Sequence, residues 1–338
     1  MKSSCFHAKT ADWRNRPVQV EEFMIPASDL GIELYVRNKH LASMCKWKPE
    51  STVICVHGGT YPGHALYDTA LDGFSWLDYL AGHGNDAYVF DIRGYGKSTR
   101  PIEMLQDPND NFAIVDGETA VRDLSSVVDF VLARRQLSRL ALIGWSWGTD
   151  LAGRYATENA DKVGRLVFFG PSWFPVPALP SRLPEKIPAY RIVKRDRALA
   201  RWLSGVPDQK RDQILPPAWG RTVLDAIWST DPLGATAEPP FIRAPNGSGK
   251  DWRDYWLAGK PFYDPAKILA PTLLVQAEWD AETPPYMSHT LFPLLVNSRG
   301  KQYTCFGEGT HNAPFERDRL NIFVAIQTFL EGYNYQAP

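Results

Sequence analysis

The residues with the clearest chemistry form the run Gly144-Trp145-Ser146-Trp147-Gly148, the only match to G-x-S-x-G in the chain. An apolar strand, Leu140–Ile143, is predicted before it and a helix, Thr149–Ala160, after it. In a strand–turn–helix of this kind the glycines permit a sharp turn that exposes the serine hydroxyl above the sheet edge. The amides that open the helix favour negative charge nearby. The motif therefore predicts Ser146 as a nucleophile, and a tight turn with an incidental serine is the alternative.

A serine hydroxyl is a weak nucleophile and needs a base that a carboxylate orients. The motif predicts the chain order serine, acid, histidine. Asp280 follows the predicted strand Thr272–Val275, and His311 follows the predicted strand Gln302–Phe306. Both therefore belong at the strand ends, where open α/β sheets bind ligands. The sequence predicts Asp280 as the acid and His311 as the base, with the flanking Glu278 and Glu282 as rival acids.

Two backbone donors are needed to hold an oxyanion. One is the N–H of Trp147, directly after the serine. The other is expected from the loop that follows the strand Thr52–Val56, where Gly59 is the first choice and Thr60 the second. The neighbouring His57 is predicted to brace this loop.

Other polar clusters indicate no second chemistry. His57 and His64 border a glycine-rich loop with no carboxylate at ligand spacing, so neither a metal nor a cofactor is expected. The stretch 91–98 lacks the spacing of a phosphate loop. It is predicted to be a scaffold turn in which Asp91 and Arg93 are structural.

Composition excludes several classes of protein. Of 338 residues, 44% are hydrophobic and 22% charged, which excludes wholesale disorder. A formal charge of -1 gives no basic face for nucleic acid. The four cysteines form no CxxC pair and are predicted to be reduced thiols. Since no secretion signal or membrane-length apolar run is found, we expect a cytoplasmic protein with no membrane partner.

The elements that must position these residues alternate between strand and helix. This alternation predicts an α/β fold with a mostly parallel sheet and helices on both faces. Besides those named above, the predicted strands are 18–25, 31–36, 87–90 and 163–169, and the predicted helices are 70–81, 118–136, 285–296 and 320–331.

The segment 172–262 has a different composition. It holds 13 of the 27 prolines and 6 of the 12 tryptophans. Helices are predicted at 190–203 and 220–229, no strand is predicted, and 246–249 reads as a flexible loop. We expect an inserted helical lid at 172–262, with a core of 1–171 and 263–338. Its apolar surface is also consistent with a homodimer contact.

Five motifs together resemble the α/β-hydrolase fold superfamily: HGG at 57–59, DIRGYGKS at 91–98, GWSWG at 144–148, WD at 279–280 and GTHNAPF at 309–315. The resemblance runs through nearly the whole chain and is least specific in the lid. It implies an eight-stranded, mostly parallel sheet with a lid inserted after the sixth strand. It also implies a triad of Ser146, Asp280 and His311.

Within that superfamily, Ser146 excludes epoxide hydrolases and haloalkane dehalogenases, which carry an aspartate at this position. The sequence is somewhat similar to prolyl aminopeptidases, but His-Gly-Gly is followed by Thr-Tyr-Pro-Gly here instead of Pro-Gly. Those enzymes hold a substrate ammonium with lid carboxylates. This lid has 14 Lys and Arg against 9 Asp and Glu, a poor host for a cation unless Glu185 or Glu238 is well placed. The branch of C–C bond hydrolases and lactonases of the zearalenone type are also similar.

The expected function is that of a serine hydrolase acting on a carboxylic ester or lactone. A tryptophan-rich cover suits a bulky apolar or aromatic small molecule. Trp145, Tyr61 and Trp173 are the candidates for substrate binding. A prolyl-type aminopeptidase, a C–C bond hydrolase and a non-catalytic binding scaffold remain alternatives.

Overall fold

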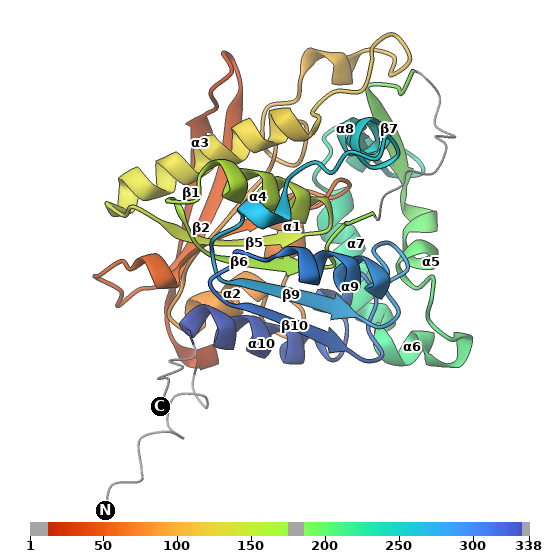
Figure 1. The fold of residues 1–338 in the computed structure, drawn as a ribbon. Coiled ribbons are helices and arrows are strands. Elements are labelled where there is room, and N and C mark those ends of the chain that lie inside the picture. The colour runs from red at the N-terminus through yellow and green to blue at the C-terminus, as the bar shows by residue number, and fades with distance from the viewer. Residues whose placement is uncertain (1–12, 175–185, 333–338) are drawn as a thin grey trace, which may run out of the picture.

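The centre of the protein is an eight-stranded sheet, seen in a computed structural model that describes residues 13–174 and 186–332 (Figure 1). The strands run from edge to edge in the order β1-β2-β4-β3-β5-β6-β9-β10. β1 and β2 form an antiparallel pair and β2 is antiparallel to β4, whereas all other neighbours are parallel. The strands are β1 Val18–Pro26, β2 Glu33–Leu41, β3 Thr52–Val56, β4 Asp86–Phe90, β5 Leu140–Trp145, β6 Val163–Phe169, β9 Thr272–Ala277 and β10 Lys301–Phe306.

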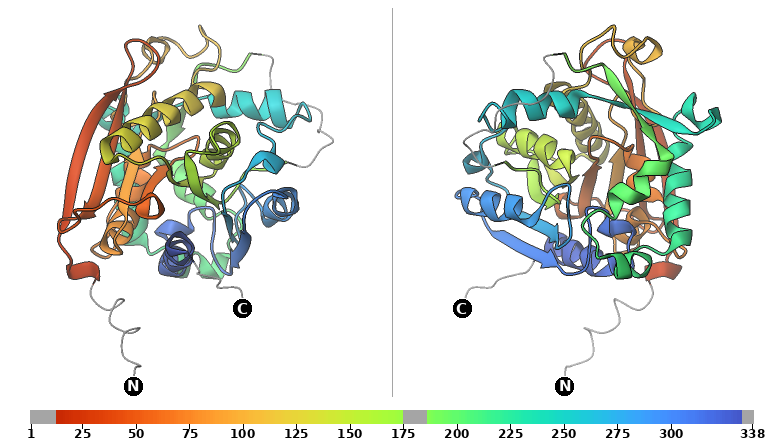
Figure 2. Two further views of the ribbon diagram at one scale, coloured as in Figure 1. Left: turned by 60° about the vertical axis from the view of Figure 1, so that its left-hand side comes forward. Right: turned by 90° about the vertical axis from the view of Figure 1, so that its right-hand side faces the viewer.

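Helices cover both faces of this sheet (Figure 2). Because successive side chains of a strand point to opposite faces, a central strand must be apolar throughout. In β5, Leu142 packs into the hydrophobic cluster under α3, α4 and α9, whereas Ala141 and Ile143 pack into the cluster under α1, α2 and α10. The helices are α1 Gly63–Asp68, α2 Trp76–Gly82, α3 Gly117–Arg135, α4 Trp147–Glu158, α9 Pro285–Leu294 and α10 Arg319–Glu331.

The predicted core strands are confirmed, and the predicted helix at 70–81 is wrong in its first half. α2 begins only at Trp76, because Ser75 caps it and exchanges hydrogen bonds with Asp78. The preceding residues form a tight turn in which Leu71 pairs with Phe74. The short helix α1 had no counterpart in the sequence analysis.

The chain between β6 and β9 carries helices, as expected, together with a small sheet that was not expected. β7 (Tyr190–Lys194) pairs antiparallel with β8 (Phe241–Pro245). The predicted helix at 190–203 is therefore wrong over its first five residues, and helix resumes only near Ala198. The helices of this segment are α5 Ala198–Trp202, α6 Arg211–Ile214, α7 Pro217–Trp228 and α8 Gly247–Asp251, and a π-helical turn continues α8 through Trp252–Trp256.

The predicted loop at 246–249 is also wrong, because most of it lies in α8. A Cβ on Gly247 would lie 1.8 Å from the carbonyl oxygen of Val115. This glycine is therefore there because two segments of backbone meet closely, not because the chain is flexible.

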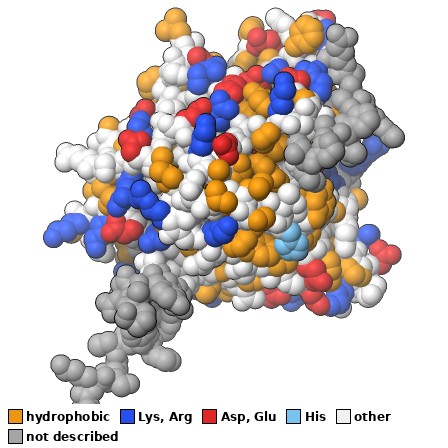
Figure 3. Space-filling model, viewed as in Figure 1, with side chains coloured by type: hydrophobic (Ala, Val, Ile, Leu, Met, Phe, Trp, Pro, Cys, Tyr) orange, Lys and Arg blue, Asp and Glu red, His pale blue; other side chains and the backbone are white. Residues whose placement is uncertain are grey.

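The surface has an apolar area over α9, where Figure 3 shows hydrophobic side chains gathered. Tyr286, Leu294 and Val296 are exposed there. Among the described residues, no helix has the length and apolar character to cross a membrane. Cys45, Cys55 and Cys305 are free thiols, and Cys5 lies outside the described residues.

Candidate active site

Ser146 stands at the junction of β5 and α4 in a backbone conformation that residues other than glycine rarely adopt. Its φ is 59° and its ψ is -128°, which is strained for a residue with a Cβ. Gly144 and Gly148 permit this turn because neighbouring backbone atoms leave no room for a side chain at either position. A Cβ on Gly144 would lie 2.5 Å from the carbonyl oxygen of Gly148, and one on Gly148 would lie 2.3 Å from that of Val56. The sequence motif thus forms the sharp strand-to-helix turn that it predicts.

His311 and Asp280 form a buried pair at the ends of β10 and β9. Nδ1 of the imidazole lies 2.8 Å from Oδ2 of the carboxylate. The other oxygen of Asp280 accepts the backbone N–H groups of Glu282 at 2.9 Å and Thr283 at 2.7 Å. Since Nδ1–H then donates to Asp280, Nε2 is left as the acceptor, as a general base requires.

The surroundings of His311 favour its charged form. Burial disfavours the imidazolium, but the charges of Asp280 and Glu282 and the hydrogen bond to Asp280 outweigh it, so the pKa of His311 is raised above its ordinary value of 6.5. Of the two rival acids, Glu282 pairs with Arg201, and Glu278 accepts the N–H of Glu308. Asp280 is the carboxylate that contacts the imidazole.

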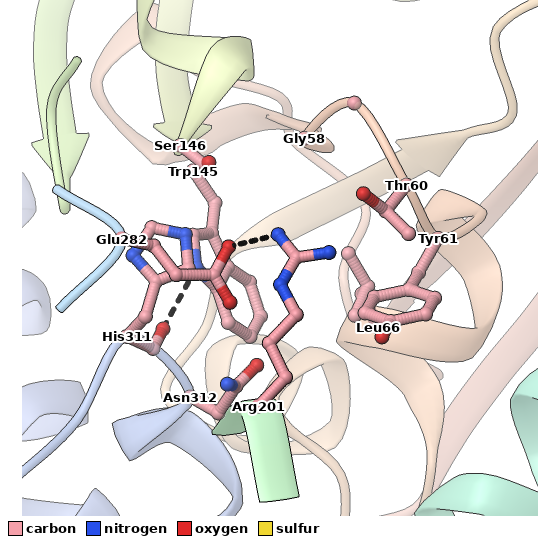
Figure 4. Close-up of a pocket in the computed structure, with 11 residues that line it drawn as sticks. Gly58, Thr60, Tyr61, Leu66, Trp145, Ser146, Arg201, Glu282, His311 and Asn312 are labelled. Atoms are coloured by element: carbon pink, nitrogen blue, oxygen red, sulfur yellow. Dashed lines mark hydrogen bonds and ion pairs between the residues drawn. The ribbon is translucent and has the colours of Figure 1, made fainter. Parts of the chain in front are cut away.

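Ser146 and His311 line one cavity beyond the carboxyl ends of the central strands. Figure 4 shows both on the same side of it, opposite Tyr61 and Leu66. Asp280 and His311 pack closely against Gly170, at the end of β6. A Cβ on Gly170 would lie 3.1 Å from both Asp280 Oδ2 and His311 Cε1. Ser146 and His311 thus line the same cavity, and Asp280 contacts His311.

Two amides are available beside the serine. Trp147 is the first residue of α4, so its N–H has no acceptor within the helix. Gly59 lies close by, since a Cβ on it would lie 3.7 Å from the Cβ of Trp147. The carbonyl of Gly59 accepts Tyr95 Oη at 3.0 Å and Arg191 Nη2 at 2.6 Å. These two hydrogen bonds hold the Gly59 carbonyl in place. Thr60 lines the same cavity and accepts from Arg191 at 2.9 Å.

Comparisons with known proteins agree with this arrangement. A family model described as alpha/beta hydrolase fold matches residues 51–205. The chain has the α/β-hydrolase fold. The predicted α/β-hydrolase fold is thereby confirmed.

Solved structures share the α/β-hydrolase fold over nearly their whole length. They include a thermophilic esterase from Thermogutta terrifontis, with a TM-score of 0.57, 16% identity, and coverage of 92% of this chain and 98% of that one. CarC, a serine hydrolase involved in carbazole degradation, has a TM-score of 0.63, 17% identity, and coverage of 93% and 99%. A 2-hydroxy-6-oxo-6-phenylhexa-2,4-dienoate hydrolase from Rhodococcus sp. strain RHA1 has a TM-score of 0.57, 13% identity, and coverage of 92% and 99%. No curated protein matches the sequence.

The aromatic candidates occupy different places in this hydrolase fold. Trp145 and Tyr61 line the cavity beside Ser146. Trp145 also donates to the carbonyl of His311 at 3.1 Å, which ties the histidine loop to β5. Trp173 does not line it and packs against Trp256 and Tyr263 instead.

A larger cavity of about 440 Å³ opens on the lid side of Ser146. Sequence reasoning missed several residues that line it. Asp150 stands four residues after Ser146 on α4, a spacing that places both at the same side of the helix. The others come from the lid, or in one case from the loop after Asp280, and no motif marked them: Arg191, Arg201, Asp251, Trp252, Trp256 and Glu282.

The remaining predicted polar residues have structural contacts. His57 is fully buried and accepts the N–H of Ile92 at 3.0 Å. Asp91 contacts His64 at 2.7 Å and accepts the N–H of Lys97. Arg93 pairs with Asp123 and Asp29. Among the residues that the structure describes, no cluster of three metal-ligating side chains occurs.

Proposed function

We propose that this protein is a serine hydrolase that cleaves a carboxylic ester or lactone of a bulky, apolar or aromatic substrate. The observation that carries the proposal is the convergence of Ser146 in its strained turn with the Asp280–His311 pair on one cavity. Esterases and serine hydrolases are among the proteins with a similar fold, which is consistent with the proposal.

In the proposed reaction, Oγ of Ser146 attacks the substrate carbonyl carbon while Nε2 of His311 takes the hydroxyl proton. Asp280 holds the imidazole in the required tautomer and stabilises its positive charge. The N–H groups of Gly59 and Trp147 hold the oxyanion of the tetrahedral intermediate. When the intermediate collapses, His311 returns the proton to the leaving alkoxide and an acyl-enzyme remains.

Water then attacks the acyl-enzyme carbonyl, with His311 again accepting a proton. Collapse of the second intermediate returns that proton to Ser146 and releases the carboxylic acid. One ester and one water thus give one acid and one alcohol, or one hydroxy acid from a lactone.

The proposal is tested by screening the purified protein against p-nitrophenyl esters of increasing acyl length, aromatic lactones, proline naphthylamide and a coloured dienoate. We expect turnover of esters or lactones, and a loss of kcat on the order of 10³-fold or more in Ser146→Ala. A fluorophosphonate probe should label the wild-type protein only. Turnover confined to the naphthylamide or the dienoate would identify an aminopeptidase or a C–C bond hydrolase instead. An unlabelled, inactive wild-type protein would indicate a binding scaffold.

A further inference from the structure

Two buried carboxylates border the larger cavity on the lid side of Ser146. Asp150 comes from α4 of the core and Asp251 from the end of α8 in the lid, and each is only 3% exposed. Carboxylates are rarely so buried without a cationic partner. Neither one forms an ion pair with a basic side chain within the described residues.

Their hydrogen bonds are incomplete in a specific way. Asp251 accepts the backbone N–H of Gly117 at 3.0 Å and the indole N–H of Trp147 at 2.9 Å. Oδ2 of Asp150 accepts the hydroxyl of Ser172 at 2.6 Å. The other oxygen, Oδ1, has no hydrogen-bond partner among residues 13–174 and 186–332. A buried, unpartnered carboxylate oxygen is costly unless something binds it.

The basic residues near this cavity are engaged elsewhere. Lys250, next to Asp251 in sequence, bonds to Asp116 and Asp254. Arg201 is paired with Glu282, across the cavity shown in Figure 4. Arg191 donates to Gly59 and Thr60 and to the carbonyl of Pro245. Asp150 and Asp251 therefore form an end of the cavity that has no resident counter-ion.

The pKa values of Asp150 and Asp251 reflect the lack of a cationic partner. Burial raises the pKa of Asp251 to about 7, and burial together with the charge of Asp251 raises that of Asp150 well above its usual range. A bound cation would favour the ionised form of both groups.

The wall beside the carboxylates is aromatic. Phe174, Trp252 and Trp256 line the cavity, and Phe174 contacts both tryptophan rings at centroid distances of 6.0 and 5.7 Å. Aromatic faces attract cations, and tryptophan does so most strongly. Carboxylates and indole rings together can recognise an ammonium group. A purely apolar substrate would leave the carboxylates unpaired.

We propose that Asp150 and Asp251, with Trp252 and Trp256, form a binding site for a protonated amine. Because this rests on the proposed hydrolase function, the substrate is an ester or lactone whose apolar body carries a basic nitrogen. The positive average charge of the lid argued against this at the level of composition. That argument does not apply to this pair. Asp150 comes from the core, and Lys250, next to Asp251 in sequence, is already bound to other carboxylates.

The decisive experiment measures binding, so that it does not depend on turnover. The probes are 2-phenylethylammonium and its neutral counterpart 2-phenylethanol, titrated calorimetrically into the full-length wild-type protein near pH 8. We expect the ammonium to bind about 10-fold or more tightly than the alcohol. In Asp150→Asn, and in Asp251→Asn as a second variant, the ratio of the two affinities should fall to about threefold or less. Asp254→Asn removes a lid carboxylate outside the cavity and should retain the wild-type ratio.

Equal or weaker binding of the ammonium by the wild-type protein would overturn the amine site. So would an unchanged ratio in both cavity variants, with circular dichroism confirming that each is folded. A second arm compares p-nitrophenyl 6-aminohexanoate with p-nitrophenyl heptanoate. If neither ester is cleaved although the ammonium is preferred, the proposed hydrolase function fails while the binding site stands. If both are cleaved and no preference for the ammonium appears, the reverse conclusion follows.

Discussion

The hydroxyl of Thr283 donates a 2.8 Å hydrogen bond to Oδ2 of Asp280, the same oxygen that contacts Nδ1 of His311. Its oxygen also lies 3.0 Å from the carbonyl of Gly170 at the end of β6. Thr283 therefore connects the carboxylate to a neighbouring strand and restricts how the acid can move beneath the imidazole.

Thr283→Val should lower kcat about 10-fold with little change in KM, because a small displacement of the acid misorients the base without touching substrate. Steady-state kinetics on the best ester from the screen measure the change. Thr283→Ser keeps the hydroxyl and should restore most of the rate. An effect on KM alone would show that Thr283 serves substrate binding instead.

Asp280→Asn should reduce kcat on the order of 10⁴-fold, because an amide no longer selects the tautomer with a free Nε2. Glu278→Gln is the matched control. Its side chain accepts the N–H of Glu308 and does not contact the imidazole, so kcat should stay within about threefold of the wild-type value. Equal losses in both variants would contradict the assignment of Asp280 as the acid.

The rate should depend on pH through His311. The base must be neutral, and Asp280 and Glu282 raise its pKa above 6.5 against the effect of burial. Activity is therefore lost as pH falls through this raised pKa, and the acid limb of kcat/KM should have its midpoint above about 6.5. Profiles recorded from pH 5 to 9 locate the midpoint. A midpoint well below 6 would show that the imidazolium is not stabilised.

Gly148→Ala should destabilise the fold, because the new methyl group would meet the carbonyl of Val56. We expect the free energy of unfolding to fall by about 1–3 kcal/mol, as measured by urea denaturation. Gly249→Ala is the control, since a Cβ there has no neighbour within 4 Å. If Gly148→Ala proved as stable as that control, the close approach of β3 and α4 would be wrong.

Arg191→Lys should lower kcat by about 10- to 100-fold, because Nη2 of Arg191 bonds to Gly59 and Thr60 while Nη1 bonds to the carbonyl of Pro245, and the single nitrogen of a lysine cannot reproduce this fork. The loss should appear in kcat more than in KM, because the Gly59 amide is proposed to hold charge that develops only during reaction. Ile192→Thr, a change of an exposed neighbour on the same strand, is expected to have little effect. Equal kinetics for Arg191→Lys and the wild type would mean that the loop keeps its orientation without the arginine.

The core was predictable because its central strands are continuous apolar runs and because the helix Gly117–Arg135 has apolar residues at a 3–4 spacing. The strained turn at Ser146 was predictable because Gly144 and Gly148 lie where backbone segments approach too closely for any side chain. Asp280 was preferred to its rivals Glu278 and Glu282 because it follows the end of a predicted strand, and the structure adds the contact to His311.

The lid was predicted less well, since its structure depends on partners distant in sequence. Tyr190–Lys194 forms a strand only because Phe241–Pro245 lies beside it. Gly247 resembles a loop residue until its contact with Val115 is known. Asp251 was missed for the same reason, because the helix that carries it into the cavity was taken for a loop.

The contact between Arg191 and Gly59 connects two segments that are distant in sequence. Arg191 stands on β7 and bonds to the loop whose Gly59 amide is proposed to receive the developing charge. Movement of β7 would break the contacts of Arg191 with Gly59 and Thr60, whereas the bond from Tyr95 to the Gly59 carbonyl would stay. The position of β7 and the orientation of the loop after β3 are therefore coupled.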